Sequence, residues 1–364
     1  MRGAIFPVLA LLAGSSPVRA QQVRAAPPAA LPASSIVIDP DGTAHLDHAT
    51  VPPSSLLSPA TRAVLARRPA AGAYPSSPPA ADMAVRRRQI EADLQPAIAH
   101  MRKLYPVDIA EGTMGGISIR SVIPQGGVPA RNLRRVILDV PGGGFRTATH
   151  ANGLTISIPI AAVGQVKVVT LIHRQGPEYR FPAGTEDVAA VYRELLKTYP
   201  PANIGMVGCS SGGAVVAETV AYFERVGLPA PGVLGLYCAR ASAKFKEGDG
   251  PAFTNLLRST VNIGENPSTY AYFEGMDPDD PKLSPVMDLT VLARFPPTLF
   301  ATGTRDFAMS AAAYSHRRML DAGVDSQLLV YDGMGHAFMT DPDLPESKSL
   351  YAIAAKFYDA HLGR

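Results

Sequence analysis

A glycine-rich turn between an apolar run and a helix-like run constrains this chain more than any other stretch. Residues 204–213 read Ile-Gly-Met-Val-Gly-Cys-Ser-Ser-Gly-Gly, and residues 214–225 have the composition of a helix. The Gly-x-Ser-x-Gly spacing is typical of a serine nucleophile on a sharp strand-to-helix turn. Its centre is Ser210, because a pattern centred on Ser211 would need glycine where the chain has Cys209. The alternative is a turn that only lets a helix pack closely on a sheet.

The length and charge of the chain limit its fold and its partners. A chain of 364 residues with 46% hydrophobic residues suits one large α/β domain with an accessory part, or two domains. The formal charge is +3, and two of the positive charges, Arg2 and Arg19, lie in the N-terminal segment. The nearly neutral remainder argues against a nucleic-acid partner.

The N-terminal residues have the pattern of a secretory signal. Residues 1–20 combine a basic start, a short apolar run and small residues up to Ala20, so we expect export with cleavage before Gln21. The apolar run is too short to span a bilayer, and no later segment is apolar enough for a stable membrane span. Residues 21–54 form an Ala/Pro-rich linker with little to bury.

Strand and helix patterns alternate along the rest of the chain. This alternation predicts a mostly parallel sheet with helices on both faces, and ligand sites at the carboxyl ends of its strands. Residues 241–294 interrupt the pattern directly after a strand, so they should lie over that edge as a lid. The expected helices are 58–67, 82–104, 185–199, 309–322 and 344–361, with weak signals at 252–261 and 268–274; the expected strands are the hairpin 107–110 and 116–123, then 135–140, 166–173, 203–207, 232–238, 297–302 and 326–331.

A serine nucleophile needs a base, and the base needs a carboxylate partner. His336 follows the strand that ends at Tyr331, on the same predicted edge as Ser210, so it is the candidate base. Asp306 follows the strand 297–302 and is the candidate acid; alternatively it caps the helix that begins near residue 309. Asp332 is the rival acid, but it lies only four residues before the histidine.

A second glycine-rich loop, Pro141-Gly142-Gly143-Gly144-Phe145, follows the strand 135–140. Its backbone can approach a ligand closely, as a phosphate-binding loop or an oxyanion hole would require. No Lys-Ser/Thr follows it, and the Gly-x-Gly-x-x-Gly pattern fails at Thr147. We therefore interpret it as an oxyanion hole.

The cysteine and histidine patterns do not predict a metal site. The two cysteines, Cys209 and Cys238, both fall at ends of predicted strands, so they either pair or remain buried thiols. His45 and His48 resemble a ligand pair, but we interpret their loop-like surroundings as a solvated turn.

These motifs, in this order, resemble the hormone-sensitive-lipase-like branch of α/β-hydrolases, also called the α/β-hydrolase fold-3 carboxylesterases. The likeness covers residues 55–364. Residues 174–187 are similar to the family's Tyr-Arg-Leu-Ala-Pro-Glu…Phe-Pro-Ala…Glu-Asp stretch, and residues 279–285 to its Asp-Pro…Ser-Pro run. The resemblance implies an eight-stranded, mostly parallel sheet in a catalytic domain formed by residues 106–240 and 295–364. It also implies a helical cap formed by residues 55–105 and 241–294.

The resemblance also implies an activity and a set of site residues. It implies that a small-molecule carboxylic ester of short to medium acyl chain is cleaved through an acyl-enzyme, with no metal or cofactor. Ser210 would be the nucleophile, Asp306 the acid and His336 the base. The oxyanion donors would be the backbone N–H groups of Gly143, Gly144 and Ser211.

This sequence departs from the family pattern at four positions around the site. Pro141 replaces a histidine, Cys209 and Ser211 replace Asp and Ala, and His173 replaces a tyrosine. No triad residue is lost, so catalysis remains the prediction, with a substrate that can differ from the usual one. A lactonase, an amidase or a non-catalytic ligand-binding receptor on the same fold are the alternatives. The sequence does not decide whether the chain forms a homodimer.

Overall fold

The computed structural model describes residues 36–46, 51–67, 82–244, 248–256 and 271–363. The chain divides into two compact units, residues 1–51 and 52–364. In the first unit, β1 (Ile36–Ile38) pairs with β2 (Ala44–Leu46) as a small antiparallel hairpin. His45 therefore lies in a strand rather than in a turn, and its exposed ring bonds to Asp39. The predicted signal segment and His48 lie outside the described residues.

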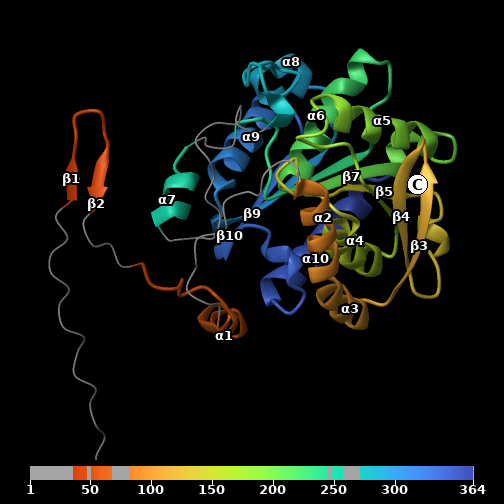
Figure 1. Cartoon of the computed structure of the whole chain (residues 1–364), viewed down its shortest axis with the longest axis horizontal. Coiled ribbons are helices and arrows are strands. Elements are labelled where there is room, and N and C mark those ends of the chain that lie inside the picture. Colours follow the sequence, from red (N-terminus) through yellow and green to blue (C-terminus); the bar gives the residue numbers. More distant parts are fainter. Residues whose placement is uncertain (1–35, 47–50, 68–81, 245–247, 257–270, 364) are drawn as a thin grey trace, which may run out of the picture. The chain divides into compact units, whose positions relative to one another are not determined.

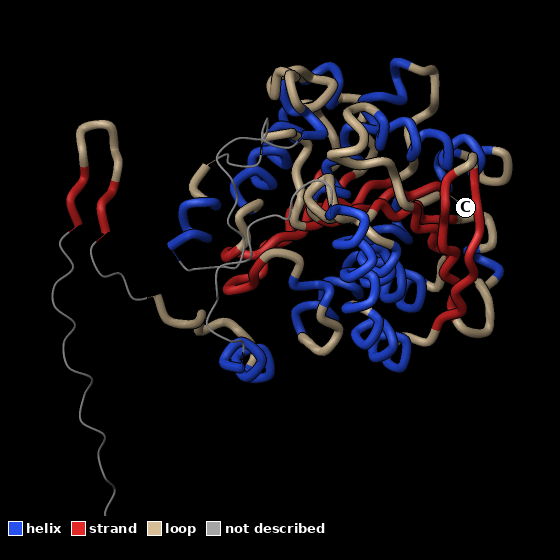
Figure 2. The backbone as a smooth tube through the Cα atoms, in the orientation of Figure 1, coloured by secondary structure: helices blue, strands red, loops and turns tan. Residues whose placement is uncertain are grey.

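The second unit is built on an eight-stranded sheet with the order β10-β9-β8-β7-β5-β6-β4-β3 (Figures 1 and 2). The strand pairs from β10 to β6 are all parallel, and the β3–β4 and β4–β6 pairs are antiparallel. This confirms the predicted fold class and hairpin. The strands are β3 (Val107–Met114), β4 (Ile117–Pro124), β5 (Val136–Val140), β6 (Lys167–Leu171), β7 (Ile204–Cys209), β8 (Val233–Tyr237), β9 (Thr298–Arg305) and β10 (Ser326–Gly335).

Helices cover both faces of this sheet because the central strands are apolar on both sides. In β5, Val136 and Leu138 pack into one hydrophobic core, while Ile137 between them packs into the other. The first core contains side chains of α5 (Ala183–Leu196), α6 (Ser211–Arg225) and α9 (Met309–Asp321). The second contains side chains of α3 (Gln95–Leu104), α4 (His150–Gly164) and α10 (Pro345–His361).

Two helices differ from the sequence predictions. The expected helix 82–104 is two helices, α2 (Met83–Asp93) and α3, which meet at Leu94 just before Pro96. Helix α4 was missed altogether. Residues 153–161 are all buried, so the helix lacks the polar face from which amphipathic helices are recognised, and it contains Pro159.

Short helices lie within the segments predicted to form a cap. Besides α2 and α3, they include α1 (Pro59–Arg67), α7 (Gly250–Leu256), a 3₁₀ turn at Ala271–Phe273 and α8 (Leu289–Leu292). In the 3₁₀ turn, the Tyr272 ring stacks on Phe145, with ring centroids 5.6 Å apart. This contact packs the turn against the residue that directly follows the Gly142–Gly144 loop. Residues 68–81 and 257–270 lie outside the described residues, so the division into cap and catalytic domain stays a prediction.

Candidate active site

The serine of the Gly-x-Ser-x-Gly pattern lies where β7 ends and α6 begins. Ser210 has φ 57° and ψ −128°, a strained backbone conformation that is rare outside glycine. The flanking glycines allow this turn. A Cβ on Gly212 would lie 2.0 Å from the Val140 carbonyl oxygen, and one on Gly208 would lie 2.4 Å from the Gly212 backbone. The turn is therefore packed too tightly for any larger residue at these two positions.

The structure brings the predicted triad residues together. His336 Nε2 lies 2.9 Å from Ser210 Oγ, and its Nδ1 lies 2.7 Å from Asp306 Oδ1. The three residues follow β7, β9 and β10, whose carboxyl ends share one edge of the sheet. With Nδ1–H donating to the carboxylate, Nε2 is left to accept the serine proton, which is the tautomer that a general base needs.

Asp306 is buried and is held by several donors. Thr302 Oγ1 donates to Oδ2 at 2.8 Å, and the Ala308 N–H donates to Oδ1 at 2.9 Å. Burial works against ionisation of this carboxyl group, but the electrostatic interaction and hydrogen bond with His336, together with smaller donors, hold its pKa below the usual value. Asp306 therefore both contacts the N-terminal turn of α9 and pairs with the histidine.

The rival acid has other partners. Asp332 accepts hydrogen bonds from Ser54 and from Thr304. It is an exposed carboxylate, and its two hydrogen-bond partners hold its pKa below the usual value. These contacts tie the segment after residue 51 to the last residues of β10, and they engage Asp332 away from His336, whose partner is Asp306.

A residue that the sequence reasoning missed completes the histidine's surroundings. The ring of Phe307 stacks on the His336 imidazole, with centroids 4.1 Å apart and an interplanar angle of 27°. Phe307 directly follows Asp306 in the chain, but nothing in its sequence position indicates that it contacts the histidine. It limits the movement of the ring between Ser210 and Asp306.

The second glycine-rich loop lies directly against the serine turn. A Cβ on Gly142 would meet the Cys209 carbonyl oxygen at 2.3 Å. The Gly143 N–H donates to Ser211 Oγ at 3.0 Å, and the Gly143 carbonyl accepts from the N–H and hydroxyl of Thr147, both at 2.9 Å. Ser211, where the family has alanine, thus holds this loop in place. The same loop begins with Pro141, where the family has histidine.

His173, which replaces a tyrosine of the family, is also buried. Burial lowers the pKa of His173 to about 4, so its ring is neutral at physiological pH. Two residues later, the Gln175 side chain makes a pair of hydrogen bonds with the backbone of Ala148, at 2.8 and 2.9 Å. These contacts fix the chain that leads from the glycine loop into α4.

A cavity of about 220 Å³ opens beside Ser210 and His336. Helix α4 forms one side of it through Asn152, Thr155 and Ile156. The other lining residues are Gly142, Gly143, Gly144, Cys209, Ala337 and Thr340. The cavity is thus lined by the Gly142–Gly144 loop, Ser210 and His336, so a ligand in it would lie against the nucleophile and the base.

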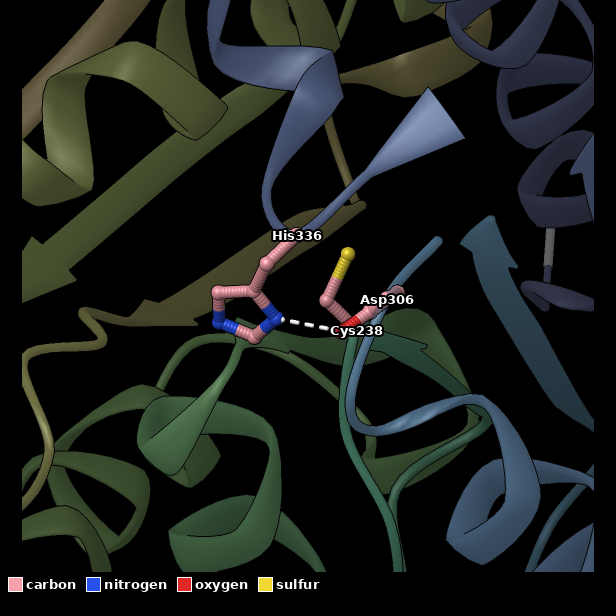
Figure 3. A group of neighbouring side chains, drawn as sticks. All are labelled: Cys238, Asp306 and His336. Carbon is pink, nitrogen blue, oxygen red and sulfur yellow. Dashed lines mark hydrogen bonds and ion pairs between the residues drawn. The ribbon is translucent and has the colours of Figure 1, made fainter. Parts of the chain in front are cut away.

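The two cysteines are free, buried thiols in this structure. Cys238 lies close to two triad residues: its Sγ, an Asp306 oxygen and a His336 ring nitrogen are all within 4.8 Å of one another (Figure 3). Within the described residues this is the one cluster of three donors with metal-ligand spacing. Its histidine and carboxylate already hydrogen-bond to each other, so the donor set fits the triad better than a metal.

Comparisons with known proteins agree with this architecture. A family described as the alpha/beta hydrolase fold matches residues 137–340. The chain is 27% identical over 239 residues to an acetyl-hydrolase of Streptomyces hygroscopicus, covering 63% of this chain and 77% of that protein. It is 25% identical to the versiconal hemiacetal acetate esterase of Dothistroma septosporum, covering 66% and 77%.

Two solved structures are also similar. Esterase E25 has 26% identity and a TM-score of 0.77 over 88% of this chain and 99% of its own. An esterase from the bacterial hormone-sensitive lipase family has 25% identity and a TM-score of 0.65, covering 79% of this chain and all of its own. The chain therefore belongs to the alpha/beta hydrolase fold family, in its hormone-sensitive-lipase-like branch of carboxylesterases.

Proposed function

We propose that this enzyme cleaves carboxylic esters through an acyl-enzyme formed on Ser210. The observation that carries the proposal is the unbroken hydrogen-bond chain from Ser210 through His336 to Asp306 beside an open cavity. His336 takes the proton as Ser210 Oγ attacks the carbonyl carbon, and then gives it to the leaving alcohol. The same histidine next activates the water that releases the acid.

Backbone N–H groups stabilise the negative oxygen of the tetrahedral intermediate. Gly143, Gly144 and Ser211 supply them, and the Ser211 N–H also benefits from the positive end of the α6 dipole. In this structure the Gly143 N–H bonds to the Ser211 hydroxyl. We propose that this bond holds the loop between turnovers and that the N–H is shared with the oxyanion when the intermediate forms.

The acyl group is short to medium in length. The cavity of about 220 Å³ is smaller than the roughly 300–1,000 Å³ of pockets that take drug-sized ligands. The names of two relatives, an acetyl-hydrolase and an acetate esterase, also support a preference of this enzyme for small acyl groups. Lactones and amides would be cleaved through the same acyl-enzyme, so lactonase and amidase activity remain alternatives. The complete triad argues against a non-catalytic receptor.

The test is a series of p-nitrophenyl esters from acetate to palmitate, assayed with the wild type and Ser210→Ala. Activity should be highest on the acetate and butyrate esters and fall steeply for the long chains. Ser210→Ala should lose activity by several orders of magnitude. An inert wild type, or a Ser210→Ala variant as fast as the wild type, would disprove the mechanism. Activity highest on palmitate would disprove only the acyl preference.

We further propose that the enzyme is exported after cleavage near Ala20. The support is the basic, apolar and small-residue pattern of residues 1–20. Within the described residues, none of the helices is long and apolar enough to cross a membrane. Intact-mass analysis of protein recovered outside the cytoplasm should give an N-terminus at Gln21. A cytoplasmic protein that retains Met1 would contradict export.

A further inference from the structure

Cys238 occupies an unusual place at the end of β8. Its backbone has φ 47°, in the left-handed region that residues other than glycine seldom adopt because it is strained. The Cys238 N–H donates to the Ala301 carbonyl of β9 at 2.7 Å, which fixes this conformation. The side chain is only 1% exposed and lies beside Asp306 and His336 (Figure 3).

The sulfur contacts both loops that carry the acid and the base. It accepts a hydrogen bond from the Ala337 N–H at 3.1 Å, directly beside His336. Ala337 also has a left-handed backbone, with φ 56°, so this bond fixes a strained residue of the histidine loop. On its other side the sulfur lies within 4.8 Å of an Asp306 carboxylate oxygen, and the thiol helps to hold the pKa of Asp306 below its usual value. One side chain thus bridges two loops that arrive from β9 and β10.

The thiol form is the one that can make both contacts. Burial, reinforced by the nearby Cys209 and Asp306, raises the pKa of Cys238 well above its usual value, so the group keeps its proton. A neutral S–H can donate to the carboxylate while its sulfur accepts from the backbone. A thiolate in the same place would repel the Asp306 charge.

We propose that Cys238 is a positioning residue of the triad, which holds the Asp306 carboxylate and the His336 loop in register through its thiol. The inference rests on the proposed function, because it assigns Cys238 a task in setting up the Ser210–His336–Asp306 hydrogen bonds. Cys238 does not line the cavity, so it acts through Asp306 and the His336 loop.

The test compares Cys238→Ala and Cys238→Ser with the wild type, using p-nitrophenyl acetate kinetics and thermal melting. Cys238→Ala removes both contacts and should lower kcat about tenfold with KM within about twofold, the loss expected for one hydrogen bond to a charged group. Cys238→Ser keeps a donor and an acceptor at the same position and should recover most of that loss. The matched control is Ser347→Ala, at a fully buried serine of α10. This substitution removes a 3.0 Å hydrogen bond to the Phe338 carbonyl and leaves the contacts of Asp306 intact. It should lower the melting temperature but not kcat.

The inference and the proposed function can fail separately. If Ser210→Ala is inactive but Cys238→Ala keeps the full kcat, the positioning role is wrong and the triad stands. If Cys238→Ala and Cys238→Ser lose equal activity, or Ser347→Ala loses as much, the effect is one of packing and the positioning role is again wrong. If the wild type and Ser210→Ala are equally active, the proposed function fails and the positioning role with it.

Discussion

The buried carboxyl group of Asp139 should make this protein less stable as the pH rises. Asp139 lies in β5 with 0% exposure, where Ser157 Oγ of α4 donates to its Oδ2 at 2.9 Å. Burial raises the pKa of Asp139 to about 7, against the ordinary value of 3.8, although the nearby hydroxyl groups of Thr170 and Ser157 work in the opposite direction. The folded protein therefore keeps a proton here that the unfolded chain has already released.

The sign and size of the effect follow from proton linkage. Below pH 3.8 both states are protonated, and stability does not depend on this group. Between pH 3.8 and about 7 only the folded state holds the proton, so the free energy of unfolding falls by about 1.4 kcal/mol per pH unit. Above pH 7 the loss is complete. From pH 5 to pH 8 the wild type should lose about 3 kcal/mol through Asp139 alone.

Asp139→Asn tests this directly, because the amide has nearly the same shape, cannot ionise, and can still accept from Ser157. Urea unfolding of both proteins should be measured at pH 5, 6, 7 and 8. The free energy of unfolding of the variant minus that of the wild type should rise by about 3 kcal/mol across this range. The difference cancels every other titrating group that the two proteins share. A difference that stays constant with pH would show that Asp139 does not retain its proton.

Three further substitutions test the site. Asp306→Asn should lower kcat by about 10³–10⁴-fold in ester kinetics, because the histidine is left in the wrong tautomer. The kcat of Asp332→Asn should stay within about twofold of the wild type. A larger loss in Asp332→Asn than in Asp306→Asn would make Asp332 the acid. Gly212→Ala places a Cβ 2.0 Å from the Val140 carbonyl oxygen, so it should lose about 1–3 kcal/mol in urea unfolding; wild-type stability would mean that the turn is looser than described. Phe307→Ala removes the ring stacked on His336 and should lower kcat about 3–10-fold at unchanged KM, with no change if the stacking is incidental.

The sequence was sufficient to predict the triad and the sheet, because catalytic chemistry and chain order leave few residues that could fill each role. A strained serine between two glycines needs a particular turn, and Ser210 adopts it. The carboxyl ends of parallel strands meet at one edge, so Asp306 and His336 could be placed beside it before any distance was known. The antiparallel hairpin of β3 and β4 was recognisable from alternating residues.

Contacts between distant segments could not be predicted in the same way. Helix α4 was missed because it is buried on nearly every side, so its sequence has no polar stripe. The bond from Gly143 to Ser211, the stacking of Phe307 on His336 and the bridge made by Cys238 each depend on how separate loops pack. At Cys238 the sequence left a disulfide open, and only the packing shows two free thiols with one of them against the triad.

The central claim is that Ser210 is the nucleophile activated by His336, and covalent labelling tests it most directly. Wild-type protein is treated with a fluorophosphonate, which phosphonylates an activated serine, and the modified residue is located by peptide mass spectrometry. The account predicts one adduct, on Ser210, and none on the His336→Ala variant under the same conditions. An adduct on Ser211 or Cys209, or equal labelling of Ser210 without the histidine, would contradict it.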